Sequence, residues 1–108
     1  MKTHTLILIL MLAIPIQASL SAGNYFNGID MYAFATSDDP VKEALFMGYV
    51  SGVLDANTEI LCVPAEVTLQ QAAGITMKYL EQHPDIRHYA GRGFVILSIT
   101  EAFPCGNK

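Results

Sequence analysis

The sequence lacks the short motifs that usually identify an enzyme. The nucleophile elbow G-x-S-x-G, the zinc motif H-E-x-x-H and the phosphate-binding P-loop do not occur among its 108 residues. The segment Gly91-Arg92-Gly93 is too short for a phosphate loop and lies within a helical pattern. The close acidic pair Asp38-Asp39 is explained by the start of a helix. We therefore expect no enzymatic activity, no cofactor and no metal.

Basic residues are scarce. Six lysine and arginine side chains stand against ten aspartate and glutamate side chains, which gives a formal net charge of −4 at pH 7. Nucleic acids and anionic membrane surfaces attract basic proteins, so neither is an expected partner. A basic protein partner would suit this charge, although an ordinary soluble surface has the same composition.

Long apolar runs are absent except near the N-terminus. Residues 6–14 are continuously apolar, Lys2 precedes them, and small residues follow at Ala18 and Ala22. The run is too short to span a bilayer, and this order is typical of a secretory signal peptide. We expect residues 1–18 to be removed, by cleavage after Ala18 or as late as Ala22. A buried helix or an uncleaved anchor is the alternative.

The rest of the chain suits one small domain, and its periodicity is helical. Four stretches show helical spacing, and none shows the alternation of a strand: 24–37, 37–57, 68–81 and 84–103. Short turns join them, without low-complexity segments or repeats. We predict an all-α, compact, four-helix-bundle-like domain over residues 24–105.

Three helix boundaries have clear signals. Asp39 followed by Pro40 is typical of a helix start, because a short acidic side chain caps the first amides and proline suits the first turn. Thr68 and Gln71 form a capping box for the third helix. Pro84 ends that helix, because the residue before a proline avoids helical backbone angles.

The spacing also predicts which faces are buried. In the first two helices the expected core positions are Tyr25, Ile29, Tyr32, Ala33, Val41, Leu45, Gly48, Tyr49 and Gly52. In the last two they are Leu69, Ala72, Ala73, Ile75, Thr76, Tyr79, Leu80, Ile86, Tyr89, Ala90, Gly93, Phe94, Leu97 and Thr100. Gly48 and Gly52 lie one turn apart, which indicates close contact with a neighbouring helix.

The two cysteines, Cys62 and Cys105, have three interpretations. In an exported protein a disulfide is favoured over a reactive thiol, because neither residue lies where a helix N-terminus would activate it. His83 and His88 have a spacing seen in zinc sites, but the proline between them breaks the shared helix face. His83 is more simply a helix C-terminal cap, with a pH-sensing role as the alternative.

Four motifs, taken in order, resemble one known family. They are FMGYVSGVLDA (46–56), CVPAEVTLQQ (62–71), YLEQHPDIRH (79–88) and ITEAFPC (99–105). Each is weak alone, but their order and spacing over about 60 residues resemble the Rap/Tai family of type VI secretion immunity proteins. Many members have two further cysteines, one of them where this chain has Leu45-Phe46. The absence of both further cysteines from this chain corresponds to the loss of one whole disulfide. The resemblance therefore implies that Cys62 and Cys105 are each other's partners.

The resemblance implies a periplasmic all-α domain, often a homodimer, that protects its own cell from a toxin. Described members plug the active-site cleft of a cell-wall amidase, a papain-like cysteine peptidase that cleaves peptidoglycan stem peptides. The matching residues are interpreted as fold determinants: Gly48, Gly52, Cys62, Cys105, Pro64, Thr68 and Pro84. A loop near the last two helices reaches the toxin in described members. That implies partner contacts for His83, Asp85 and Arg87, unless these residues only form a turn.

Two further interpretations do not involve a toxin. A small disulfide-stapled helical protein could serve as a periplasmic acid-stress or chaperone-like factor, because protonation of ten carboxylates at low pH would loosen it. A structural or assembly factor is the other alternative. The immunity interpretation is preferred because the ordered motifs and the export signal agree with it.

Overall fold

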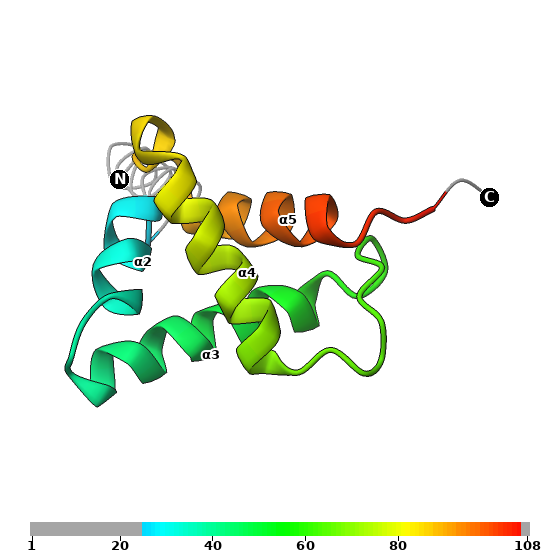
Figure 1. The fold of residues 1–108 in the computed structure, drawn as a ribbon, viewed down its shortest axis with the longest axis horizontal. Helices are drawn as coiled ribbons and strands as arrows, with labels where there is room; N and C mark the ends of the chain where they lie inside the picture. The colour runs from blue at the N-terminus through cyan, green and yellow to red at the C-terminus, as the bar shows by residue number, and fades with distance from the viewer. Residues whose placement is uncertain (1–24, 107–108) are drawn as a thin grey trace, which may run out of the picture.

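The chain folds into helices joined by short connections. The computed structural model describes residues 25–106. Within this range four α-helices and one 3₁₀ turn occur (Figure 1): α2 (Gly28–Ala35), α3 (Pro40–Ala56), α4 (Leu69–Gln82), η2 (Pro84–Ile86) and α5 (Gly91–Ala102). The same range contains no β-strand, only a bridge between Asn27 and Ala90. The predicted all-α domain is confirmed, whereas the predicted signal peptide lies outside the described residues.

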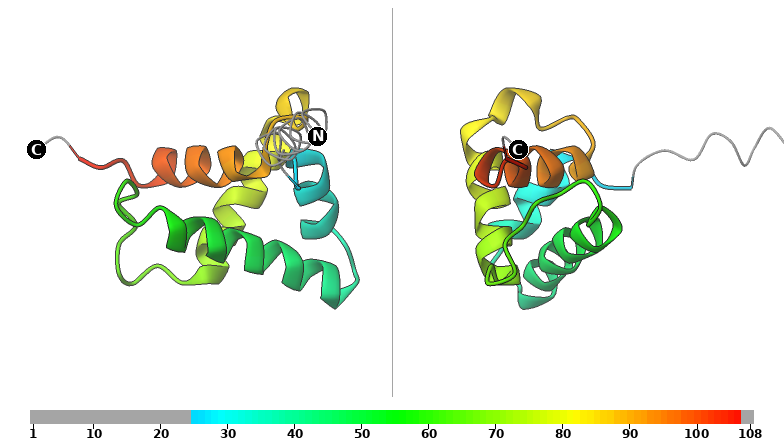
Figure 2. Two further views of the ribbon diagram at one scale, coloured as in Figure 1. Left: turned by 180° about the vertical axis from the view of Figure 1, so that it is seen from behind. Right: turned by 90° about the vertical axis from the view of Figure 1, so that its right-hand side faces the viewer.

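The helices cross one another instead of forming parallel columns. α3 and α5 extend along the long direction of the molecule, and α4 crosses both of them (Figures 1 and 2). The short α2 lies at one end and contacts the other three helices. Because every helix contacts all the others, a single core stabilises the whole domain.

Local side chains explain where three helices begin. As predicted, the Asp39 carboxylate accepts a hydrogen bond from the second amide of α3 at 2.9 Å. Thr68 and Gln71 form the predicted capping box of α4, with distances of 3.1 and 2.9 Å. A second box, between Asn27 and Asp30, was not predicted and begins α2 at Gly28. The first helix is therefore shorter than the expected 24–37.

The start of the last helix also differs from the prediction. α5 begins at Gly91, not at Pro84, because residues after Pro84 form η2 and then an irregular turn. Proline lacks an amide hydrogen, and its ring favours a short turn over continuation of α4. The seven residues released from helix between Pro84 and Ala90 become a projecting loop.

The core uses different faces of α2 and α3 from those expected. Its largest fully buried apolar side chains are Phe94, Met31, Leu80, Ile99, Val50 and Val95. Tyr25, Ile29, Val41 and Leu45 were predicted to be buried, yet they are 93%, 56%, 66% and 47% exposed. Both helices carry apolar side chains on opposite faces, so periodicity could not select the buried one.

In the more amphipathic α4, the predicted face is confirmed at Ala72, Ala73, Thr76 and Leu80. In α5 the predicted buried face is confirmed at Phe94, whereas Leu97, which was also predicted to be buried, is exposed.

The glycines that permit close packing are not the predicted ones. A Cβ atom added at Gly48 or Gly52 would meet no other atom of the described chain within 4 Å, because both residues lie on the exposed face of α3. The expected helix contact at these positions is therefore absent from the described fold. At Gly28, by contrast, a Cβ atom would lie 2.5 Å from Phe94 Cε2 and 2.7 Å from the Arg87 carbonyl oxygen. At Gly91 the contact is looser: a Cβ atom would lie 3.0 Å from Met31 Sδ.

A buried hydroxyl pair connects α4 with α5. Thr76 Oγ1 and Ser98 Oγ are 2.9 Å apart, and Ser98 donates to the Val95 carbonyl oxygen at 3.1 Å.

Ser98→Ala would leave the Thr76 hydroxyl without its partner, which should lower the free energy of unfolding by about 1–3 kcal/mol. Thr76→Val should lower the free energy of unfolding by a smaller amount, because the Ser98 hydroxyl keeps its hydrogen bond to the Val95 carbonyl oxygen. Urea unfolding of both variants tests this order, and an equal or reversed loss would contradict it.

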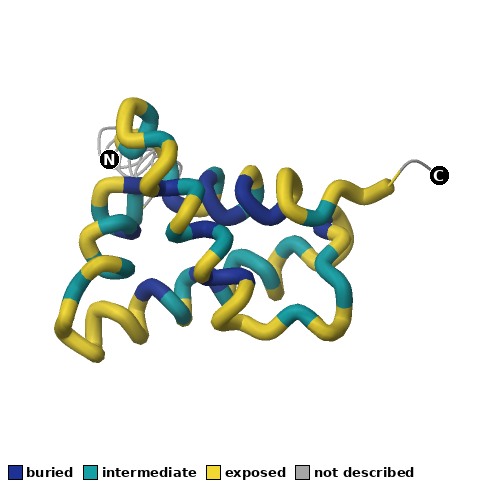
Figure 3. The backbone as a smooth tube through the Cα atoms, viewed as in Figure 1, coloured by how far each residue is buried: buried dark blue, intermediate teal, exposed yellow. Residues whose placement is uncertain are grey.

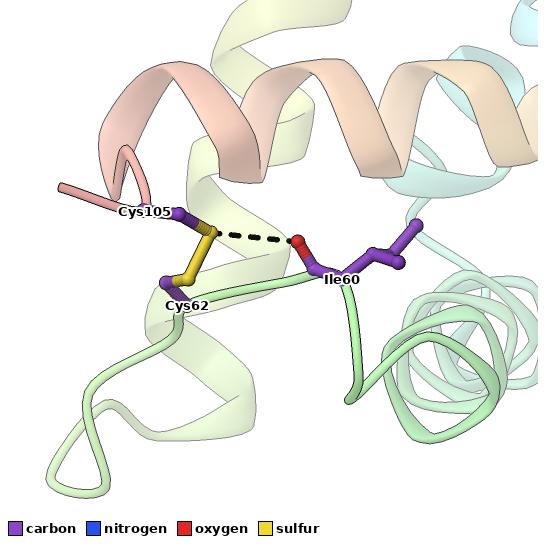
Figure 4. Close-up of a disulfide and its surroundings, with 3 residues drawn as sticks. All are labelled: Ile60, Cys62 and Cys105. Carbon is purple, nitrogen blue, oxygen red and sulfur yellow. Dashed lines mark hydrogen bonds between the residues drawn. A yellow bond between two sulfur atoms is a disulfide. The ribbon is translucent and has the colours of Figure 1, made fainter. Parts of the chain in front are cut away.

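The disulfide joins two segments at one end of the molecule. Cys62, after α3, is bonded to Cys105, after α5, with a Cα–Cα distance of 5.1 Å (Figure 4). The Ile60 carbonyl oxygen lies 3.4 Å from the Cys105 sulfur; an oxidised sulfur has no proton to donate, so this is a polar contact and not a hydrogen bond. The predicted pairing is confirmed. Among the described residues, no group of three or more histidine, cysteine or acidic side chains is arranged to hold a metal.

Candidate functional site

The candidate site is the segment between α4 and α5, residues 83–90, called here the 83–90 loop. It projects from the helical body, toward the end opposite the disulfide (Figure 1). Every residue of the loop is exposed or half-buried (Figure 3). Its exposed positions are Pro84, Asp85, His88 and Tyr89, of which Tyr89 is 59% exposed.

His83, at the base of the loop, has a structural role. Its Nδ1 atom lies 2.8 Å from the Tyr79 carbonyl oxygen, so this nitrogen is the donor. Its ring stacks on that of Tyr79, with centroids 3.9 Å apart. The hydrogen bond satisfies one of the last carbonyls of α4, as predicted for a helix C-terminal cap.

Arg87 faces the helical body. Its Nε atom donates to the Leu80 carbonyl oxygen at 2.8 Å, and its Nη2 atom donates to the Glu81 carbonyl oxygen at 3.5 Å. The guanidinium also lies over the Tyr32 ring, 3.7 Å from its centroid. A cation satisfies the carbonyls at the negative end of α4 and is attracted to the aromatic face. Arg87 thus connects the loop to both α4 and α2.

Asp85, His88 and Tyr89 face away from the helical body, unlike Arg87. All three are exposed, and the rings of His88 and Tyr89 lie side by side with centroids 4.3 Å apart. Of the three residues for which the resemblance implied partner contact, Asp85 therefore lies on the outer surface, whereas His83 and Arg87 point largely into the fold. The exposed aromatic at Tyr89 was missed because this segment was predicted to be helical and Tyr89 to be buried.

The loop is joined to the start of α2 by backbone hydrogen bonds. The Gly28 amide donates to the Tyr89 carbonyl oxygen at 3.0 Å, and the Ile29 amide donates to the Arg87 carbonyl oxygen at 2.9 Å. The Gly91 amide donates back to the Phe26 carbonyl oxygen at 2.8 Å. The first amides of a helix have no partner within it, so the loop supplies the acceptors that α2 needs. Gly28 allows the two backbones to come this close.

Two further surfaces are apolar and open. One is a groove of about 560 Å³ beside α4, bounded by Val67, Ile75 and Phe103, with Glu66 and Lys78 at its edges. The other is a groove of about 410 Å³ along the exposed face of α3, containing Gly48 and Gly52. Both are shallow depressions and not enclosed cavities. In the described chain, no helix is long and apolar enough to cross a membrane.

Of the remaining residues singled out in the sequence, Pro84 lies in the 83–90 loop and the others lie outside it. Pro64 lies in the connection between α3 and α4, where its carbonyl oxygen accepts a hydrogen bond from Val67 at 3.1 Å. Thr68 caps α4 near the disulfide, and Pro84 begins η2. The sequence therefore named residues at both ends of the molecule, and the structure separates them into a stapled end and a loop end.

Comparison with known families gives a match over most of the chain. Residues 22–105 match the family described as Rap1a immunity proteins, which is most of the chain. No curated protein matches the sequence. An immunity protein acts on a cognate toxin, so the family gives the general role and the kind of partner. The chain belongs to the Rap1a immunity protein family.

Proposed function

We propose that this protein inhibits a peptidoglycan-cleaving amidase of a type VI secretion system by placing the 83–90 loop in its active-site cleft. The immunity family supports the role, and the resemblance of the motifs supports the class of toxin. The observation that carries the mechanism is the projecting loop, whose exposed side chains include those of Asp85, His88 and Tyr89. A projecting, aromatic-bearing loop fits a concave partner, and buried aromatic side chains commonly dominate binding energy at interfaces.

The proposed inhibition is steric and needs no chemistry from this chain. The loop presents a carboxylate and two rings that can enter a cleft and exclude substrate. His83 and Arg87, which the resemblance placed near the toxin, would support the loop from beneath. The acidic net charge also suits a basic surface around the cleft of the toxin.

The proposal is tested with the purified mature protein and the amidase encoded beside its gene. We expect a stable complex and loss of peptidoglycan cleavage at equimolar protein. A deletion strain should be sensitive to attack by sister cells, and expression of the protein should restore protection. Absence of binding, together with unchanged resistance of the deletion strain, would reject the proposal.

We further propose that the protein acts in the periplasm after removal of residues 1–18 and that two copies associate. The sequence supports export, and an oxidising compartment agrees with the Cys62–Cys105 disulfide. The exposed apolar face of α3, which includes Val41, Leu45 and Gly48, supports association. Sedimentation of the mature protein should show a dimer that Leu45→Glu converts to a monomer. A monomeric wild-type protein would reject this part.

A further inference from the structure

The 83–90 loop has too little regular structure to hold its own shape. Its internal backbone hydrogen bonds are few: the Ile86 amide donates to the His83 carbonyl oxygen at 3.4 Å, and the Tyr89 amide donates to the Ile86 carbonyl oxygen at 3.0 Å. η2 contains three residues and has no side-chain cap. A segment of this kind ordinarily opens easily, because few contacts oppose its conformational entropy. Contacts with other elements must therefore fix the loop.

The side-chain contacts from the middle of the loop to α4 and α2 are those of Arg87. Its side chain bonds to the carbonyl oxygens of Leu80 and Glu81 and lies over the Tyr32 ring, while its own carbonyl oxygen accepts the Ile29 amide. One residue thus joins the end of α4, the middle of α2 and the start of α2. Asp85, His88 and Tyr89 are spaced around it in sequence but face outward.

We propose that Arg87 is a positioning residue, which with the Tyr32 ring holds the 83–90 loop in one conformation in the free protein and so presents Asp85, His88 and Tyr89 to a partner. The guanidinium is held by backbone acceptors and an aromatic face, and its interactions extend along one side of the loop. A loop fixed before binding loses less conformational entropy when it enters a cleft. The same arrangement distinguishes two groups of residues: Arg87 and Tyr32 fix the loop, and the exposed side chains contact the partner.

This inference rests on the proposed function for its meaning in binding, but it can be tested without a toxin. The measurement is amide hydrogen exchange, resolved by NMR, in the free mature protein with its disulfide intact. The reporting amides are those of Gly28, Ile29, Tyr89 and Gly91, which form the hydrogen bonds within the loop and at its junction with α2. Amides in the middle of α4 and α5 serve as the reference for global unfolding.

Arg87→Ala should raise exchange at the four reporting amides by about tenfold relative to the α4 and α5 reference, because it removes a charge-assisted hydrogen bond and the ring contact. Tyr32→Leu should raise it by a smaller factor, and Tyr32→Phe should leave it unchanged because the ring is kept. Arg87→Lys should restore part of the protection, since a cation returns without the planar fork.

The matched control is His88→Ala with Tyr89→Ala, which removes exposed rings from the same loop. Exchange at the reporting amides of Gly28, Ile29 and Gly91 should stay as in the wild type, because these side chains do not hold the backbone. The amide of residue 89 is left out of this comparison, since the variant replaces that residue. Two results would overturn the inference. Exchange unchanged by Arg87→Ala would show that the loop is fixed without it, and an equal rise in the α4 and α5 amides would show a purely global effect. Either result leaves the inhibitor proposal standing, and failure to bind an amidase leaves the positioning role standing.

Discussion

Replacement of both Cys62 and Cys105 by alanine is expected to lower the free energy of unfolding by about 4 kcal/mol. The two residues are separated by 43 positions, and release of a loop of this size restores that much conformational freedom to the unfolded chain. Small single domains are stabilised by about 5–15 kcal/mol in total, so the loss is a large fraction. The effect should be greatest near the segment after α5, because residues 104–106 form no backbone hydrogen bond with the rest of the described chain.

Urea unfolding followed by circular dichroism measures this loss. The oxidised wild type, the wild type treated with a dithiol, and the double variant should be compared at one protein concentration. The reduced wild type should match the double variant, and the dithiol should not change the double variant. A difference below about 1 kcal/mol between oxidised and reduced protein would show that the staple is not a main source of stability.

The second large effect is expected at Gly28. Gly28→Ala should lower the free energy of unfolding by about 3 kcal/mol, because the added methyl group would overlap Phe94 and the Arg87 carbonyl oxygen. Phe94 is buried and the Arg87 carbonyl belongs to the backbone, so neither can move aside cheaply. The hydrogen bonds from Gly28 and Ile29 to the 83–90 loop should lengthen at the same time.

Gly48→Ala is the matched control, since it makes the same chemical change in another helix. At Gly48 the methyl group would meet no described atom, and alanine is favoured over glycine inside a helix by about 1 kcal/mol. Gly48→Ala should therefore raise the free energy of unfolding of the monomer by up to about 1 kcal/mol. Thermal unfolding of both variants tests the opposite signs. Both variants should be compared in the monomeric Leu45→Glu background, because the face of α3 that carries Gly48 is the proposed dimer surface. In that background, a destabilised Gly48→Ala would contradict the open position of this residue.

The sequence predicted the parts of the fold that are decided by local chemistry. The caps at Asp39 and Thr68 and the break at Pro84 depend on residues within one turn, so spacing alone identified them. The buried face of α4 was also found, because this helix is apolar on one side and polar on the other. The buried faces of α2 and α3 were not found, because apolar side chains such as Met31 and Ile29 lie on opposite sides of the same helix.

The resemblance pointed to the segment that forms the projecting loop, but it did not show which side chains of that segment are exposed. The resemblance directed attention to His83, Asp85 and Arg87, and all three do lie in or next to the projecting loop. Which of them point outward depends on α2, a helix more than forty residues away in sequence that accepts the loop through Gly28 and Tyr32. No local pattern contains that information. His88 and Tyr89 were therefore missed as surface residues of the site.

The most direct test of the binding account compares a variant in the 83–90 loop with a variant in the groove beside α4. The dissociation constant for the proposed amidase partner should be measured for His88→Ala with Tyr89→Ala and for Lys78→Ala in the groove beside α4. Loss of two buried aromatic contacts should weaken binding by at least about a hundredfold, whereas Lys78→Ala should bind as the wild type does. Unchanged affinity of the loop variant, or a larger loss at Lys78, would contradict the assignment of the 83–90 loop as the inhibitory surface.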